Sequence, residues 1–429
     1  MNNTEFLNEL EQARQLAQKG ELDTALKIFD QLYATDNNEQ NLSLVYYMQN
    51  VLKQAGDYDK AIEIGLSAFK LPEVWDSIRH NTAWCIYFQY FKDKCELPVE
   101  DAIEWLEKIK ELFPSAPGLH PLPLSVFSYI NKHPELPPAL IIQLCLLLDP
   151  QKLETEPVPN KNGKFPFPSQ REKYITILTK AYFATENYNE CLDLCQETLN
   201  SSLPLTPNEP IWLKRRIALC HSHLGEEEKA LQEMKEILQT KKDWFLYYEA
   251  ATISFTLKNI EEAVDFAIRA ALGPGDIENK IHLWELLKSI LLELKLFDKA
   301  VEMLQFIVSI RKFKQWSIPQ SLNKELNSYH ISLDNLPHYK ELFSRFRKWL
   351  PELLSKNAQE LSGNIKFLLP HKKAGFISSG KETYYFRTAD CQIPVDDIQP
   401  GLKVKFIVQP GFDAKKQKET LVATNIQKE

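Results

Sequence analysis

A small group of cysteine and histidine residues near the middle of the chain has the side chains needed to bind a metal ion. Cys191 and Cys195 are four residues apart, so a helix would place both thiols on one face, and Cys220, His221 and His223 follow further along. Thiolate and imidazole groups are the ligands that zinc prefers. Cysteine is also a common small residue of protein cores. We expect these side chains to pack in the core and predict no metal site.

Other catalytic patterns are missing from the sequence. It contains no Walker loop, GxGxxG, HExxH or GxSxG motif. Its carboxylate clusters, such as residues 226–228, are typical of a solvated helix start. We therefore expect no enzyme activity and no cofactor.

The cysteines and the apolar segments indicate the cellular compartment of the protein. The seven cysteines are odd in number and include no CxxC pair, which favours reduced thiols. The first residues lack the basic and apolar profile of a signal peptide, and the apolar run 139–148 is too short to span a bilayer. We predict a cytoplasmic protein with no membrane partner.

Charge is distributed unevenly along the chain. Residues 1–310 carry 31 Lys and Arg against 46 Asp and Glu, whereas residues 311–429 carry 20 against 12. The net charge is thus −15 in the first part and +8 in the second. A basic end on an acidic body favours contact with a polyanion at that end, although an uneven surface charge alone would look the same.

One short pattern recurs through the first three quarters of the chain: a turn residue, an acidic or amide residue, and then a small residue that opens an amphipathic run. The small residues are Ala25, Ala61, Ala102, Cys191, Ala230, Ala263 and Ala300. A residue that tolerates the left-handed conformation would end one helix, and the acidic or amide residue would begin the next. Alanine would fit where two helices of a hairpin lie closest, so we predict repeated helical hairpins, including a degenerate copy near 137–139.

The repeats resemble the tetratricopeptide family in their period, turn glycine, small alanine and aromatic residue, over roughly residues 4–310. The resemblance implies an α-solenoid whose concave face binds extended peptides or helices of a protein partner. Candidate groove aromatics, most of which we expect to pack between layers, are Trp84, Tyr87, Phe88, Tyr90, Phe91, Trp244, Phe245, Tyr247 and Tyr248.

Composition divides the chain into five segments. Five prolines in residues 150–169 exclude a regular helix, so this segment should connect the sub-arrays 1–149 and 170–310. Residues 311–357 form a basic linker with a helix near 337–350, which would cap the solenoid or extend a basic face. Residues 358–429 should form a separate β domain, because the hydrophobic period there changes to 2.

That last segment contains five short strand patterns, which suit a small closed barrel of the OB type. The expected strands are 363–369, 372–377, 384–387, 401–408 and 420–426. Alternation along them places Ile377 and Phe386 in the core and turns Phe376 and Tyr385 outward.

The order of motifs resembles a cold-shock domain over nearly all of residues 361–428. Segment 363–367 resembles the first-strand motif, 372–377 the first ribonucleoprotein motif and, loosely, 384–388 the second. Later segments, 401–406 and 423–426, also match. In that family aromatic rings stack on unpaired bases while lysines follow the phosphates. Ala374 and Thr388 depart from the pattern, each in place of an aromatic residue.

Carried over position by position, the resemblance implies a binding surface for single-stranded RNA or DNA. Its candidate residues are Lys366, Phe367, Lys372, Lys373, Phe376, Tyr385, Arg387, Lys403 and Lys405. Arg387 replaces a stacking histidine and can stack through its guanidinium plane.

The fold class predicted from the sequence is mainly α: a tetratricopeptide-like α-solenoid followed by a small five-stranded OB or cold-shock-like β-barrel. The function expected is an adaptor that binds a protein through its repeats and a single-stranded nucleic acid through its barrel. The alternative is a protein-only scaffold whose barrel serves docking or dimerisation.

Overall fold

In a computed structural model of the chain, the described residues are 3–35, 41–71, 73–93, 95–113, 120–163, 165–354, 360–370, 372–413 and 418–429. The start of the predicted β domain, at residue 358, lies outside them. The chain divides into two compact units, Met1–Arg216 and Ile217–Glu429. The division falls inside helix α11, and the five segment boundaries expected from the sequence stay a prediction.

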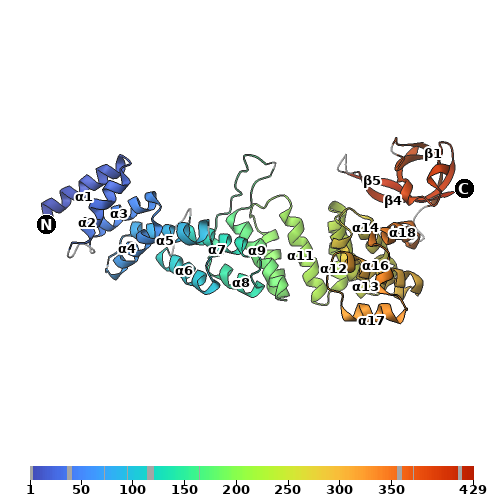
Figure 1. Cartoon of the computed structure of the whole chain (residues 1–429), viewed down its shortest axis with the longest axis horizontal. Helices are drawn as coiled ribbons and strands as arrows, with labels where there is room; N and C mark the ends of the chain where they lie inside the picture. Colours follow the sequence, from blue (N-terminus) through green and yellow to red (C-terminus); the bar gives the residue numbers. More distant parts are fainter. Residues whose placement is uncertain are drawn as a thin grey trace. The chain divides into compact units, whose positions relative to one another are not determined.

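The first unit is built from helices that pack in consecutive pairs (Figure 1). Its α-helices are α1 (Asn3–Gln18), α2 (Leu22–Tyr33), α3 (Leu42–Ala55), α4 (Tyr58–Ser67), α5 (Asp76–Ile86), α6 (Val99–Leu112), α7 (Pro121–Lys132), α8 (Pro138–Leu146), α9 (Gln170–Ala184), α10 (Tyr188–Asn200) and the start of α11 (Glu209–His223). Its short helices are η2 (Ala68–Lys70), η3 (Tyr87–Lys92), which is a π-helix, and η4 (Pro150–Lys152).

The second unit continues with helices and ends in a β-sheet. Its further α-helices are α12 (Glu227–Thr240), α13 (Trp244–Thr256), α14 (Ile260–Leu272), α15 (Ile281–Glu293), α16 (Phe297–Phe313), α17 (Gln320–Ser328) and α18 (Tyr339–Trp349). Its short helices are η5 (Glu278–Lys280), η6 (Leu333–Asn335), η7 (Leu350–Leu353), η8 (Thr388–Asp390) and η9 (Val395–Asp397). Its strands are β1 (Glu360–Leu368), β2 (Ala374–Ser379), β3 (Glu382–Arg387), β4 (Lys403–Asp413) and β5 (Lys418–Lys428).

The turns of the helical hairpins have the conformation that the sequence pattern predicts. At six of the repeats the turn residue has a positive φ angle, namely Gly20, Gly56, Glu186, Gly225, Lys258 and Lys295. Three of these are not glycine, so those turns adopt a left-handed conformation that L-residues seldom take. The geometry of the turn, rather than glycine itself, is what the repeats share.

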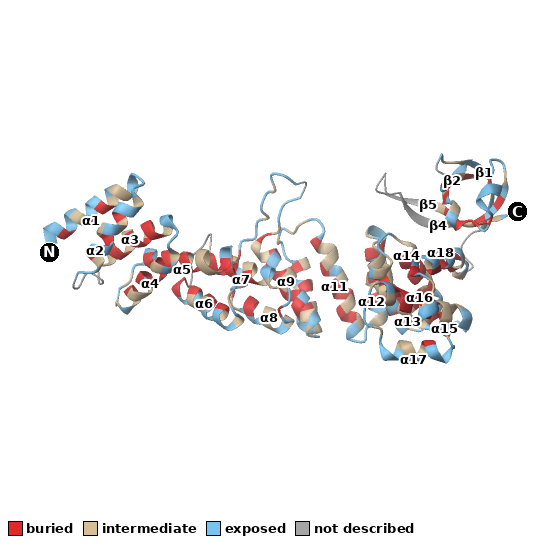
Figure 2. Cartoon of the chain, viewed as in Figure 1, coloured by how far each residue is buried: buried red, intermediate tan, exposed pale blue. Residues whose placement is uncertain are grey.

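The small residue of each repeat is buried, which confirms the predicted register. Ala25, Ala61, Ala102, Cys191, Ala230 and Ala263 are 0% exposed, and Ala300 is 2% exposed. Figure 2 shows buried positions along the sides of the helices that face one another. No side chain larger than that of cysteine occupies these positions, so the two helices of each hairpin can pack closely.

We expect Ala61→Leu and Ala230→Leu each to lower the free energy of unfolding by roughly 1–3 kcal/mol, because a larger side chain overpacks a filled interface. Urea denaturation of the full chain measures this change. Glu63→Leu, at an exposed position of the same helix as Ala61, is the matched control and should change stability little. If the alanine variants unfold like the parent protein, these positions are not close contacts and the register is wrong.

The segment between α8 and α9 is an extended loop, as its prolines predict (Figure 1). Val158 and Phe167 form an isolated antiparallel bridge, with both backbone hydrogen bonds at 2.8–2.9 Å. Each of these two residues is flanked by prolines, which lack a backbone N–H and so cannot donate a hydrogen bond to a further strand. The prolines are Pro157, Pro159, Pro166 and Pro168. The loop is therefore pinned at this bridge without exposing an edge that could pair further.

The C-terminal strands form a closed barrel in the order β1-β2-β3-β5-β4 (Figure 1). Its core contains Ile365, Ile377, Phe386, Val404 and Phe406, all at most 1% exposed. The five predicted strands are confirmed with small shifts at their ends. The fold class is thus as predicted: a mainly helical repeat array followed by a small five-stranded barrel.

Candidate nucleic-acid interface

The alternation of the barrel strands turns one set of aromatic rings away from the core. Ile377 and Phe386 are 0% exposed, whereas their neighbours Phe376 and Tyr385 are half-buried on the outer face. The assignment of the two faces made from the sequence is therefore confirmed.

A β-bulge places Phe367 on the same outer face. In β1, Ile365 pairs with Ile377 and Phe367 pairs with Phe376, so Lys366 is an extra residue between the two pairs. Without this extra residue, Phe367 would share the inward side of Ile365, two positions earlier. Phe367 is instead 42% exposed. Lys366 is exposed beside it.

The three rings form a row across adjacent strands, called here the aromatic ladder: Phe367, Phe376 and Tyr385. Phe367 pairs with Phe376, which in turn pairs with Tyr385. The ring centroids of Phe367 and Phe376 are 5.1 Å apart, and those of Phe376 and Tyr385 are 5.6 Å apart. Such a row of outward rings offers neighbouring surfaces on which successive bases can stack.

Gly375 allows the strands to come together beneath the ladder. A Cβ atom at this position would lie 2.6 Å from the carbonyl oxygen of Phe367 and 2.7 Å from the ring of Phe386. Both distances are shorter than real contacts allow, so only glycine fits. The need for glycine at this position could not be predicted from the sequence, because it depends on a close approach between strands.

The predicted lysines lie on several elements of the same barrel. Lys366 lies in the bulge, and Lys372 and Lys373 lie in the turn that leads into β2. Lys403 and Lys405 lie on β4, opposite Asn364 and Ser362 of β1. All five lysines are exposed. Exposed lysines of this kind attract a phosphate backbone through their positive charge.

Arg387, another predicted site residue, is part of an ion pair. Its Nε atom donates to Asp390 at 3.1 Å, and Arg347 of α18 donates to the other oxygen of Asp390, also at 3.1 Å. The side chain of Asp390 is only 7% exposed and that of Arg347 only 19%. Burial lowers the pKa of Arg347, while the Asp390 carboxylate opposes this shift. These three residues join the barrel to helix α18.

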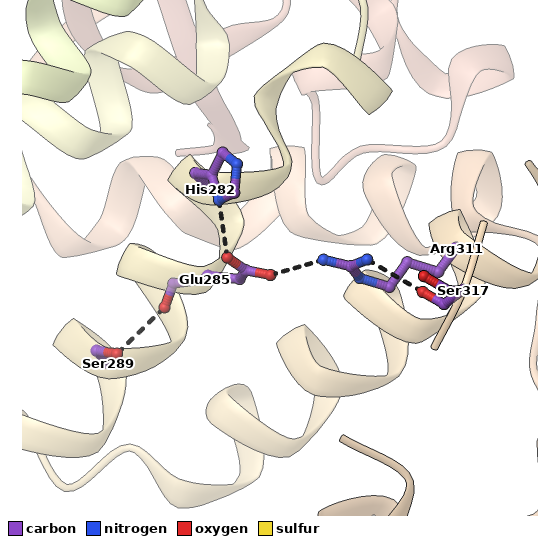
Figure 3. A network of polar contacts seen from close by, with 5 residues as sticks. All are labelled: His282, Glu285, Ser289, Arg311 and Ser317. Carbon is purple, nitrogen blue, oxygen red and sulfur yellow. Dashed lines mark hydrogen bonds and ion pairs between the residues drawn. The ribbon is translucent and has the colours of Figure 1, made fainter. Parts of the chain in front are cut away.

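The basic residues that precede α17 form ion pairs and hydrogen bonds with other segments of the helical array. Arg311 pairs with Glu285 at 3.2 Å and donates to the carbonyl of Ser317, in a network that also holds His282 and Ser289 (Figure 3). Lys312 donates to the carbonyl of Leu333 at 2.6 Å. Lys314 pairs with Glu278. These contacts fix the chain after α16.

Helix α18, within the predicted range 337–350, covers the end of the helical array. Leu342 and Phe346 are 0% exposed and join the core that contains Trp284 and Phe306. This packing is that of a capping helix. Its Lys340, Arg345 and Lys348 remain exposed.

The three cysteines and His221 pack in the interior of the protein, as expected. The expectation that His223 also packs in the core is wrong, because this residue is exposed at the last position of α11. Cys191, Cys195 and Cys220 are 0% exposed, and Cys191 contacts the carbonyl of Thr179 at 3.2 Å. His221 pairs with Glu233 at 2.8 Å. Over the described ranges, no group of three His, Cys, Asp or Glu side chains is placed to hold a metal ion.

The candidate groove aromatics of the solenoid mostly touch other rings. Phe91 is fully buried against Tyr129, and Tyr90 stacks on Trp105 with centroids 4.8 Å apart. Phe88 stacks on Tyr58 at 5.4 Å. These contacts are the packing between layers that we predict for most of the set. Within the described part of the chain, no helix is both long and apolar enough to cross a membrane.

Comparisons with known proteins give partial matches. A family model described as Domain of unknown function (DUF7017) matches residues 211–348, less than half of the chain. A search of curated proteins found no match. A solved tetratricopeptide repeat protein from Parabacteroides merdae is 15% identical and covers 67% of this chain and 100% of its own, with a TM-score of 0.27.

Two further solved structures are similar at the same level. The TPR2AB-domain:pHSP90 complex of yeast Sti1 is 12% identical over 63% of this chain and 90% of its own, with a TM-score of 0.28. The structure of Naa15/Naa10 bound to HypK-THB is 15% identical over 82% of this chain and 53% of its own, with a TM-score of 0.41. These scores are too low for any feature of those proteins to be transferred to this chain.

Proposed function

We propose that this chain is a cytoplasmic adaptor without catalytic activity, and that its barrel binds single-stranded RNA or DNA. The observation that carries the proposal is the aromatic ladder, together with the five exposed lysines of the same barrel. Rings on adjacent strands supply stacking surfaces for bases, and the lysines supply the charge that follows a phosphate backbone. The net positive charge of residues 311–429 supports the same assignment.

The helical array supplies the second half of the proposed adaptor. Stacked hairpins present a concave face along which an extended peptide or a partner helix can lie. One shallow cavity in the first unit, of about 160 Å³, is lined by Arg14 and Gln18 of α1 and by Tyr47, Asn50 and Gln54 of α3. A mixed aromatic and amide lining of this kind suits a protein segment, so this cavity is a candidate contact for the protein partner.

One observation favours the alternative of a protein-only scaffold. The barrel already uses Asp390 and Gln392 for docking, since Gln392 donates to Glu352 of η7 at 3.2 Å and Asp390 binds Arg347. A barrel that docks on helices of its own chain could dock on another protein. The ladder, however, does not include Asp390 or Gln392. Docking through those two residues therefore leaves the three outward rings of the ladder unexplained.

Titration of the full chain into a labelled oligonucleotide tests the proposed function. We expect the logarithm of the binding constant to fall linearly with the logarithm of salt concentration, by about 0.7 for each phosphate contact. Lys373→Ala should weaken binding to every sequence and make this slope shallower by about one contact. Lys19→Ala, an exposed lysine of the first unit, is the control and should leave the slope unchanged. If no oligonucleotide binds at low salt, the protein-only scaffold is the better account.

A further inference from the structure

A second row of outward side chains runs parallel to the aromatic ladder. Asn364 of β1 pairs with Ser378 of β2, and Ser378 pairs with Thr383 of β3. Each of them lies next to a buried residue of its own strand, namely Ile365, Ile377 and Tyr384, so alternation directs all three outward. This set is called here the polar row: Asn364, Ser378 and Thr383.

The polar row lies close enough to the ladder to meet the same ligand. Ser378 follows Phe376 by two residues on β2, and Thr383 precedes Tyr385 by two residues on β3. Two residues of extended strand span about 7 Å. A base that stacks on a ladder ring and extends along the strand therefore points its edge at this row.

The chemistry of the polar row differs from that of the lysines around it. Its amide and hydroxyl groups are neutral and can both donate and accept hydrogen bonds. Base edges are neutral donor and acceptor patterns, whereas phosphates are anions that attract lysine. On the neighbouring strand, the residue opposite Asn364 is the exposed Lys403. Neutral and charged groups thus lie side by side on one face.

The hydroxyl groups of the adjacent residues Ser378 and Ser379 make different contacts. One holds two strands together, and the other is suited to bind a ligand. Ser379 donates to the carbonyl of Ser362 at 2.7 Å, a short bond between β2 and β1. Ser378 lies 3.4 Å from the carbonyl of Asn364, at the long limit of a hydrogen bond. The Ser378 hydroxyl therefore loses little when it turns toward a base.

We propose that the polar row hydrogen-bonds to the edges of bases stacked on the ladder, so that Asn364 and its neighbours make the barrel selective among nucleotides. This inference rests on the proposed function, since it needs a single strand on the ladder. The ladder and the lysines give affinity for single strands of any sequence, whereas the polar row gives the preference for particular bases.

The test compares the affinity of the full chain for oligo(dT), oligo(dC), oligo(dA) and oligo(rU) of about eight nucleotides, a length within the range of one such barrel. We expect the wild-type protein to prefer one of them. Asn364→Ala should weaken binding to the preferred oligonucleotide about 10-fold and the others much less, because a hydrogen-bonded base contact carries discrimination of that order. Since Asn364 is exposed, circular dichroism should show an unchanged fold.

Lys403→Ala is the matched control, because it removes a charge directly opposite Asn364 on β4. This substitution should weaken binding to all four oligonucleotides equally and leave the preference among them unchanged. An unchanged preference in Asn364→Ala and in a Ser378→Ala, Thr383→Ala double variant would overturn the inference. Equal wild-type affinity for all four would also overturn it and leave the proposed function standing. Binding of none would refute the proposed function itself.

Discussion

Phe376→Ala is expected to weaken binding of a single-stranded oligonucleotide by roughly 1–3 kcal/mol, and Tyr385→Ala by a similar amount. Each substitution removes one stacking surface from the ladder. Phe376 is the middle ring and contacts both of its neighbours, so its loss also leaves Phe367 and Tyr385 without the ring between them. We therefore expect the larger effect at Phe376, and a double variant that loses less than the sum of the two.

Fluorescence anisotropy of the full chain with a labelled oligonucleotide measures these losses. Because both rings are only half-buried, the variants should keep their fold. Val395→Ala controls for loss of apolar surface, since Val395 is 43% exposed outside the ladder, and it should bind normally. Phe386→Ala removes a ring that is 0% exposed and should instead destabilise the barrel by roughly 3–5 kcal/mol. Normal binding by both ladder variants would rule out stacking on these rings.

Asp390→Ala is expected to lower the free energy of unfolding by about 3 kcal/mol, because it leaves two arginines without their shared carboxylate. Arg387 is 46% exposed and can be hydrated once the pair is lost. Arg347 is only 19% exposed, so its charge would remain partly buried without a partner. The substitution should mainly weaken the contact between the barrel and α18, because Asp390 and the two arginines form that contact.

Urea denaturation followed by tryptophan fluorescence suits this test, because Trp349 lies at the end of α18, two residues after Arg347. Glu341→Gln is the matched control: it removes the carboxylate of an exposed ion pair, with Arg345, on the same helix. Such surface pairs contribute little to stability. An Asp390→Ala protein that unfolds at the same urea concentration as Glu341→Gln would show that the Asp390 pair does not hold the barrel in place.

Much of the helical array could be predicted because its signals are local. The small residue of each repeat, including Cys191, is buried as its position in the pattern requires. The turn residues Glu186, Lys258 and Lys295 adopt the same left-handed conformation as the glycines they replace. Position in the repeat was therefore a better guide than residue type. The same holds for the alternation that separates Phe376 from Ile377.

Features that depend on contacts between distant segments could not be predicted. Arg347 looked like part of a basic helix face, yet its partner Asp390 lies 43 residues further along the chain. Arg311, Lys312 and Lys314 form a basic cluster in the sequence, but each is bound to a group from another segment. The bulge at Lys366 was also missed, because it depends on the pairing between β1 and β2.

The most direct test of the account is ultraviolet crosslinking of the full chain to a single-stranded oligonucleotide, with the modified residues identified by mass spectrometry. Crosslinks should form at Phe367, Phe376 or Tyr385, and the yield should fall as salt displaces the oligonucleotide from the lysines. Crosslinks confined to the helical array, or none at a concentration that saturates binding, would contradict a nucleic-acid interface on the barrel.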